Sequence, residues 1–146
     1  MTEIGRLPQH KTTHQKGGSD EIDATGLAGR VNYIDRGDPA GWDFQVSDLT
    51  TNGAWHDLDL SAIVPAGAKQ VHISAYIQDD ASTTSLSFRK KGNTQVINVL
   101  SGYVPAANTV AKFEGFVTLN AARIIEYMAT NQTWSGIYIA IRGWLI

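Results

Sequence analysis

Alternation of apolar and polar side chains is the feature that most constrains how this chain can fold. Residues 70–77 read QVHISAYI, in which every second residue is apolar. The same spacing returns further along the chain, in Leu86 and Phe88 and again in Ile137, Ile139 and Ile141. A period of two places these side chains on one side of an extended backbone, as in a β-strand with one buried face. The sequence therefore predicts strands at these three places.

Weaker alternation predicts five further strands, at residues 42–46, 55–60, 95–100, 112–119 and 123–129. Turn-forming residues separate the segments, at 65–67, 79–80, 91–93 and 131–132. Residues 120–130 also fit a helical face, but Ile124, Ile125 and Tyr127 favour a strand. About eight short strands joined by polar turns predict an all-β fold, an antiparallel β-sandwich or jelly roll.

The composition changes near residue 31. Residues 1–30 contain no aromatic side chain, and their few large apolar residues are scattered among glycines. Such a segment buries too little surface to offset the entropy lost when it becomes ordered. We therefore predict an extended N-terminal arm over residues 1–30, which gains order on another surface, and a β-sandwich domain over residues 31–146.

Length, charge and cysteine content exclude several classes of protein. A chain of 146 residues has room for one domain, and a net charge of −2 argues against a nucleic-acid binder. The absence of cysteine excludes disulfides and thiolate metal sites. No apolar run approaches the ~18 residues of a membrane span, so no membrane partner is expected.

Catalysis finds little support in the sequence. The nucleophile, phosphate-loop and zinc-protease motifs are missing, and no cofactor is expected. Several carboxylates could in principle pair for glycoside hydrolysis, namely Asp57, Asp59, Asp79, Asp80, Glu114 and Glu126. Acidic pairs in sandwich loops look the same in a sequence, because their separation cannot be read from it. The prediction is a protein that is not an enzyme.

His10 and His14 are the best metal-ligand candidates. Three copies of each could gather around the axis of a trimer and bind a divalent cation. Pro8 before them and the two threonines between them argue against a helix that would present both rings together. The simpler interpretation, exposed histidines on an extended arm without a metal, is preferred.

Aromatic residues suggest two kinds of surface. The tryptophans Trp42, Trp55, Trp134 and Trp144, with Tyr76, Tyr103 and Tyr138, could form a sugar-binding platform. The preferred interpretation is that most tryptophans in a domain of this size lie in the core, at its rim or at a subunit interface. On the last predicted strand, Tyr138, Arg142 and Trp144 alternate with the isoleucines and so would share the opposite face. A strand that is apolar on both sides suggests a covered face, and we predict a subunit interface through these residues.

One stretch resembles a segment of tailed-bacteriophage structural proteins. Residues 10–22, HKTTHQKGGSDEI, followed by TGLAG at 25–29, look like the segment that often precedes tail-fibre or head-appendage domains. The residues that carry this likeness are His10, His14, Gly17, Gly18, Asp20, Glu21, Ile22 and Leu27. The body is similar to a β-rich domain of the same proteins, in residues 55–69, 79–80, 88–93, 123–127 with 129–131, and 141–144.

The resemblance implies an accessory virion protein, commonly a homotrimer, made in the host cytoplasm. It brings no catalytic residues. The chain is short for a complete tail fibre, so we expect a capsid decoration or head-fibre protein. Its arm would attach to phage capsid or tail proteins while the sandwich projects outward. The alternatives are a tail appendage and a receptor-recognition module that binds a host surface glycan.

Overall fold

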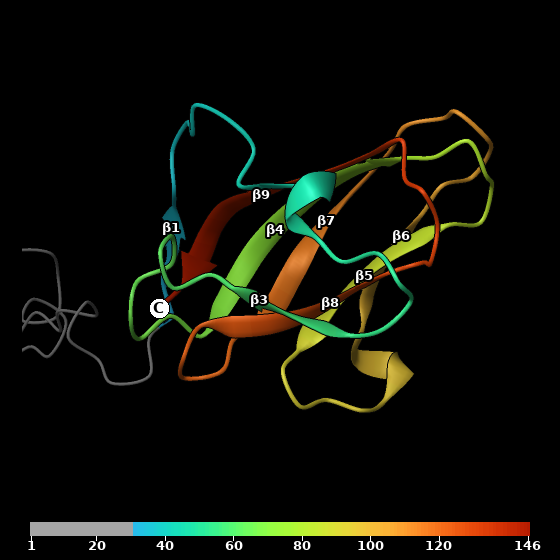
Figure 1. Cartoon of the computed structure of the whole chain (residues 1–146). Coiled ribbons are helices and arrows are strands. Elements are labelled where there is room, and N and C mark those ends of the chain that lie inside the picture. Colours follow the sequence, from blue (N-terminus) through green and yellow to red (C-terminus); the bar gives the residue numbers. More distant parts are fainter. Residues whose placement is uncertain (1–30) are drawn as a thin grey trace, which may run out of the picture. The chain divides into compact units, whose positions relative to one another are not determined.

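The computed structural model describes residues 31–146; the predicted arm, residues 1–30, lies outside this range. The described residues form two antiparallel sheets packed against each other (Figure 1). Their strands are β1 (Tyr33–Asp35), β2 (Phe44–Gln45), β3 (His56–Asp59), β4 (Gln70–Gln78), β5 (Ser85–Lys90), β6 (Leu100–Tyr103), β7 (Ala111–Thr118), β8 (Ile124–Ala129) and β9 (Gly136–Leu145). Two 3₁₀ turns, η2 (Val46–Asp48) and η3 (Val96–Asn98), lie between strands.

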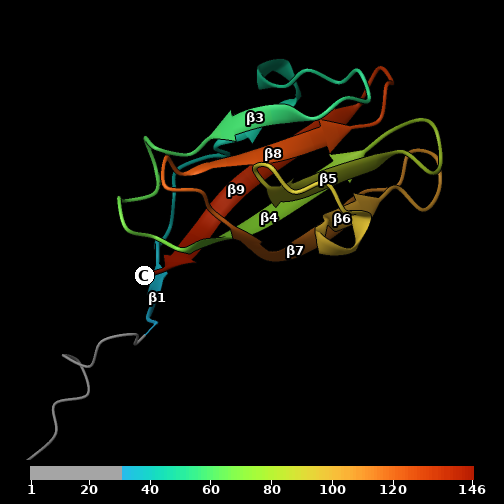
Figure 2. The ribbon, with the colours of Figure 1, turned by 90° about the horizontal axis from the view of Figure 1, so that it is seen from below.

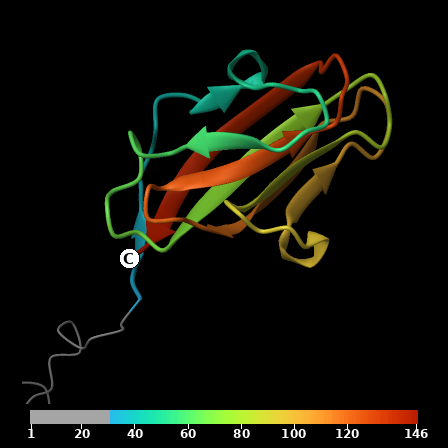
Figure 3. The same ribbon diagram turned by 60° about the horizontal axis from the view of Figure 1, so that its bottom comes forward.

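The strand order is that of a jelly roll. One sheet has the order β1-β9-β4-β7, with β2 also paired to β9, and the other has the order β3-β8-β5-β6. With β2 set aside, the first strand pairs with the last, β3 with β8, β4 with β7, and β5 with β6. A long hairpin folded into two layers gives this nesting (Figures 2 and 3). The predicted all-β sandwich is confirmed.

The core lies between the inner faces of the two sheets. Ile137, Ile139 and Ile141 of β9 are fully buried, as the alternation predicted. From the other sheet, Phe88 and Ile125 are equally buried and belong to the same hydrophobic cluster. Burial of one such side chain is worth about 1.5–3 kcal/mol, so this shared interior is the main source of stability.

Two glycines close one side of the sandwich, where β6 of one sheet meets β7 of the other. A Cβ atom on Gly102 would lie 2.0 Å from the ring of Phe113, and one on Gly115 would lie 2.8 Å from Leu100. Each strand thus contributes a glycine that receives a large side chain from the opposite strand. Because any side chain at Gly102 would displace the Phe113 ring, the close approach of β6 and β7 requires glycine there.

The predicted elements differ from the structure at three places. The strand expected at 95–100 is wrong: residues 96–98 form η3, and Val96 and Ile97 are 83% and 85% exposed. No neighbouring strand covers these side chains, so their apolar character does not produce a strand there. The helical alternative for 120–130 is also wrong, because β8 occupies this segment. The short strand β1 was not predicted.

Candidate functional site

The outer face of the five-stranded sheet carries the candidate site. On β4, the outward residues His72, Ser74 and Tyr76 alternate with the buried side chains of the core. Aromatic rings on this face form two groups. The tryptophan cluster consists of Trp42, Tyr76 and Tyr138, and the histidine cluster consists of Tyr33, His72 and Phe116.

The tryptophan cluster is built on two strands and a loop. Tyr76 of β4 and Tyr138 of β9 are direct cross-strand neighbours. The indole of Trp42 lies over both, with ring centroids 5.1 Å from Tyr76 and 5.6 Å from Tyr138. The Lys112 ammonium lies 5.4 Å from the centre of the Tyr76 ring. Trp42 nevertheless stays 42% exposed, so part of its apolar surface is open to a ligand.

The histidine cluster lies at the end of the five-stranded sheet where β1 pairs with β9. His72 and Phe116 are cross-strand neighbours with stacked rings 4.6 Å apart. The hydroxyl of Tyr33 lies 3.2 Å from Nδ1 of His72, and its ring meets both partners edge-on. A Cβ atom on Gly143 would lie 2.6 Å from this hydroxyl. Only glycine at that position lets the Tyr33 ring cover β9.

Small side chains separate the two clusters. Ser74 of β4 and Ala140 of β9 lie opposite each other. They form the next outward-facing pair after Tyr76 and Tyr138. Above them is a cavity of about 350 Å³, whose lining includes Tyr33, Asp35, Asp38, Lys112 and Arg142. A shallower hollow of about 250 Å³ adjoins it beside Trp42. We call these two hollows the outer-face groove.

The loop between β1 and β2, residues 36–43, forms one wall of the groove and is fixed to β9. The carboxylate of Asp43 accepts hydrogen bonds from the Arg36 guanidinium at 2.5 Å and from the Ile141 backbone N–H at 2.7 Å. Arg36 also donates to the Ile141 carbonyl oxygen at 3.1 Å. Because the Asp43 side chain is largely buried, these bonds hold Asp38 and Trp42 in place.

A β-bulge in β9 overturns one prediction about this face. His72 pairs with Gly143 whereas Ile73 pairs with Ile141, so Arg142 is an extra residue without a partner on β4. After the bulge the side chains change sides. Trp144 therefore lies opposite the buried Val71 and packs against the core. The expectation that Trp144 shares a face with Tyr138 and Arg142 is wrong.

Tyr138 and Arg142 do lie on the exposed outer face. The guanidinium of Arg142 donates to the Glu114 carboxylate of β7 at 2.9 Å. Both side chains are about half exposed, at 50% and 46%. The role of Tyr138 and Arg142 in a subunit interface stays a prediction.

The other residues of the predicted sugar platform are dispersed. Trp134 is buried and donates its indole N–H to the Thr130 carbonyl oxygen at 3.0 Å. Trp55 is covered by the Arg89 guanidinium, 3.9 Å from its ring centre. Tyr103 is exposed on β6, in the opposite sheet. The structure thus brings together Trp42, Tyr76 and Tyr138 of the predicted set and adds the histidine cluster.

Sequence reasoning missed the histidine cluster, although a signal was present. His72, Ser74 and Tyr76 occupy the polar positions of the alternation in 70–77, just as Tyr138 does in the last strand. The second face of an antiparallel sheet also follows the period of two. Aromatic residues at those positions would have indicated an outer face of unusual composition.

The candidate catalytic carboxylates mostly serve as structural partners. Asp57 and Glu126 lie opposite each other on β3 and β8, and each has its own cation, Lys91 and Arg89 respectively. Asp59 accepts a hydrogen bond from the backbone N–H of Ser61 at 2.8 Å, and this bond lowers the pKa of its carboxyl group. These pairings describe a network on the outer face of the four-stranded sheet.

The anchoring residues predicted in the arm, with the possible metal ligands His10 and His14, lie outside the described residues. Within residues 31–146, no group of three or more histidine and acidic side chains is arranged to hold a metal ion. No helix in the same range is long and apolar enough to cross a membrane.

No protein-family model matches this chain, and no curated protein matches its sequence. The outer-face groove and the other exposed apolar residues are therefore the features of the molecule that bear on its function.

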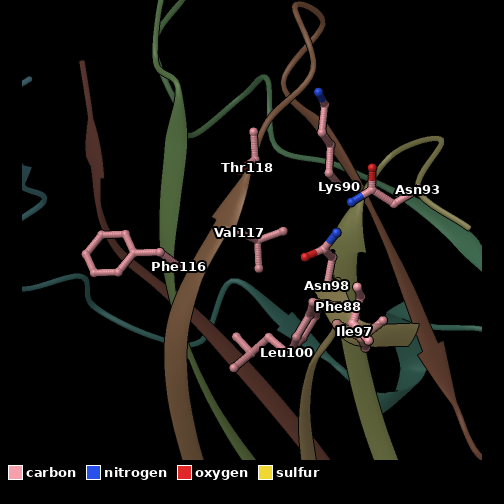
Figure 4. A pocket seen from close by; sticks show the side chains of 10 residues that line it. Phe88, Lys90, Asn93, Ile97, Asn98, Leu100, Phe116, Val117 and Thr118 are labelled. Carbon is pink, nitrogen blue, oxygen red and sulfur yellow. The ribbon is translucent and has the colours of Figure 1, made fainter. Parts of the chain in front are cut away.

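A further hollow, of about 500 Å³ and separate from the outer-face groove, lies between η3, β5, β6 and β7. Figure 4 shows Ile97 and Leu100 close to this hollow, together with the polar side chains of Lys90, Asn93 and Asn98. Phe116 points to the other side of β7, toward the outer face. The exposed pair Val96 and Ile97, which we call the η3 tip, is an exposed apolar surface separate from the aromatic face.

Proposed function

We propose that this chain is a non-enzymatic structural protein of a tailed-phage virion, a capsid decoration or head-fibre protein. The proposal starts from the likeness of residues 10–29, and of the strands that follow, to phage structural proteins. A jelly roll is compatible with it, because viral capsid and lectin domains use this fold. Fold alone does not establish function, so the exposed surfaces of the domain are the more specific support.

The observation that carries the proposal is the aromatic outer face of the five-stranded sheet. Trp42 and Phe116 are 42% and 48% exposed there, and the η3 tip exposes two further large apolar side chains. Large apolar groups gathered on a surface are typical of places where another molecule binds. Two such surfaces on one small domain suit a protein that connects a particle to something else.

The arm is proposed to provide attachment to capsid or tail proteins, through His10, His14, Gly17, Gly18, Asp20, Glu21, Ile22 and Leu27. Its composition supports this role, because a segment without aromatic residues needs a partner surface to become ordered. The domain of residues 31–146 then projects from the virion.

A deletion of residues 1–30 tests whether the arm makes the attachment while the domain folds without it. The expected result is a soluble protein that melts cooperatively and no longer binds to purified particles of the phage that encodes it. The full chain is the control for binding, and circular dichroism with heating measures folding. Loss of the cooperative transition would show that the arm belongs to the core. Binding that persists without the arm would show that the domain itself makes the attachment.

The number of copies of the chain per particle indicates whether it lies on the capsid or on the tail. Quantitative mass spectrometry of gradient-purified particles should find the chain in numbers comparable to the major capsid protein. A number comparable to the tail-tip proteins would instead indicate a tail appendage. Complete absence from purified particles would contradict the proposal as a whole.

We further propose a homotrimer, with contacts between copies at the η3 tip. Trp144 packs against the core, which removes the anchor of the interface predicted on β9, whereas Ile97 is 85% exposed. Ile97→Asp should convert the trimer to a monomer in sedimentation experiments while the melting temperature changes little. Tyr138→Ala is the matched variant: dissociation by this change alone would place the interface on the aromatic face.

A glycan-binding receptor module is the second candidate function. The outer-face groove favours it, because aromatic side chains flank a cavity with charged and hydroxyl groups. The two functions are compatible, since a particle-bound protein can carry a receptor-binding site.

A further inference from the structure

We propose that the outer-face groove is a binding site for an uncharged oligosaccharide, with the Trp42 indole as its main stacking surface. This inference rests on the second candidate function, glycan binding, and does not depend on the position of the protein on the virion. Four observations carry it: the two aromatic clusters, the small residues between them, the balance of charge, and the fixed loop.

Aromatic groups at both ends of the groove suit the faces of sugar rings. A sugar ring has an apolar face of C–H groups that packs against a flat aromatic ring, and its edge carries hydroxyl groups. His72 and Tyr76 are four residues apart on β4, a separation of about 13 Å along an extended strand. The two clusters therefore suit a chain of sugar units more than one monosaccharide.

The register between β4 and β9 determines which side chains form the floor of the groove. Ser74 and Ala140 pair at the middle of the face, between the aromatic pair Tyr76 and Tyr138 and the pairing of His72 with Gly143. The small side chains of Ser74 and Ala140 leave a hollow of about 350 Å³ between larger neighbours, which include Tyr33, Lys112 and Arg142. A hollow of this size lies within the range of small-molecule sites, which is about 300–1,000 Å³.

The charges at the groove favour an uncharged ligand. Its lining includes two carboxylates, Asp35 and Asp38, and two cations, Lys112 and Arg142, so the formal charges cancel. Arg142 is moreover paired with Glu114. An acidic glycan would meet these carboxylates, whereas sugar hydroxyl groups can donate to carboxylates and accept from cations at once. Carboxylates that accept hydrogen bonds and cations that donate them therefore match an uncharged, hydroxyl-rich molecule.

The same arrangement argues against a protein partner on this face. Protein interfaces have an apolar centre depleted of charge and a polar rim. At the groove this arrangement is reversed. The charged residues Lys112, Arg142 and Asp38 line the central cavity, and the aromatic clusters flank it. A flat partner would bury these charges without filling the hollow, which costs free energy.

The groove is also formed before a ligand arrives. Asp43 fixes the loop that carries Trp42, and the stacked rings of His72 and Phe116 support Tyr33. A preformed site avoids the entropy cost of ordering side chains on binding. Asp43 is thus a positioning residue for Trp42.

Nuclear magnetic resonance of the full ¹⁵N-labelled chain tests the proposal, because each of the four tryptophans gives one indole N–H signal. The probes are short uncharged oligosaccharides of glucose, galactose, mannose and N-acetylglucosamine, with hexuronic acid oligomers as the charged comparison. We expect at least one uncharged oligosaccharide to shift the Trp42 signal in a saturable way. The Trp134 signal should stay fixed, because this indole is buried and bonded to Thr130.

Variants then identify the site. Trp42→Ala should weaken binding of that oligosaccharide at least about tenfold, as expected for an aromatic anchor. Ala140→Leu should do the same by filling the floor without removing an aromatic ring. Tyr103→Ala removes an exposed aromatic residue from the opposite sheet and should leave affinity unchanged. Melting curves of all three variants show that each is folded.

Several outcomes would overturn the proposal. They are a Trp42 signal that no uncharged oligosaccharide shifts, binding of the hexuronic acid oligomers alone, and equal affinity in the wild type and Trp42→Ala. A Trp42 signal that moves with protein concentration, without sugar, would show that copies of the chain meet on this face. None of these results bears on whether the protein is found on particles, which the copy-number experiment measures separately.

Discussion

The two sheets have the same kind of inner face but opposite outer faces. Outside the four-stranded sheet, polar groups satisfy one another: Ser87 and Ser101 share a hydrogen bond of 2.8 Å, and Arg89 donates to Glu126 at 2.7 Å. Outside the five-stranded sheet, aromatic rings gather in two clusters and stay partly exposed. The outer face of the four-stranded sheet thus exposes Tyr103 beside mostly paired polar groups, whereas the outer face of the five-stranded sheet gathers its exposed rings in two clusters.

This difference separates stability from binding. A jelly roll needs only its shared interior and solvated outer faces to be stable, and the four-stranded sheet meets that need with ion pairs and hydroxyl groups. Exposed aromatic rings add little to stability, because much of their surface stays in contact with water. Their presence on one face is therefore better explained by a ligand than by folding.

The largest expected effect tests whether the inner face of β9 belongs to the common core. Ile139→Asp places a charge where the side chain is fully buried and should cost several kcal/mol. A domain with a total stability of about 5–15 kcal/mol would be partly or fully unfolded. Tyr138→Asp, one residue away on the exposed face, is the matched control and should melt close to the wild type. Equal melting of both variants would mean that the assignment of faces on β9 is wrong.

The next comparison uses one ion pair from each outer face. The Arg89–Glu126 pair is mostly buried, with side chains 14% and 16% exposed, and Arg89 also covers Trp55. Arg89→Ala should cost about 2–3 kcal/mol, because it leaves Glu126 without its partner. Arg142→Ala removes an exposed pair and should cost less than about 1 kcal/mol. Urea denaturation measures both, and similar losses would contradict the contrast between the faces.

A smaller effect is expected where β1 pairs with β9. In Gly143→Ala the new methyl group would lie 2.4 Å from the Ile34 carbonyl oxygen and displace Tyr33 from the histidine cluster. The expected cost is about 1–2 kcal/mol, as for other overpacked sites. Gly41→Ala, with nothing within 4 Å of the added atom, should change stability by less than about 0.5 kcal/mol. Equal stability of the two variants would mean that β1 is not packed tightly against Gly143 of β9.

Much of the fold could be predicted from the sequence. The alternation in residues 70–77 and in the isoleucines of β9 predicted the strands and their buried sides, and both are confirmed. The strand at 95–100 was wrong, because apolar residues form a strand only where a neighbour pairs with them. Trp42, Tyr76 and Tyr138 were named among the possible members of a sugar-binding platform, but the sequence did not predict that these three gather, and the arm remains a prediction.

The sequence by itself determined which side of each strong strand is buried, since the side chains of an extended backbone alternate and apolar ones are excluded from water. Only the tertiary structure decided what lies on the outer face. Pairing between β4 and β9 places Ser74 beside Ala140, and the bulge at Arg142 turns Trp144 toward the core. Both depend on register between strands distant in the chain, and local periodicity carries no information about which residues face each other across a sheet.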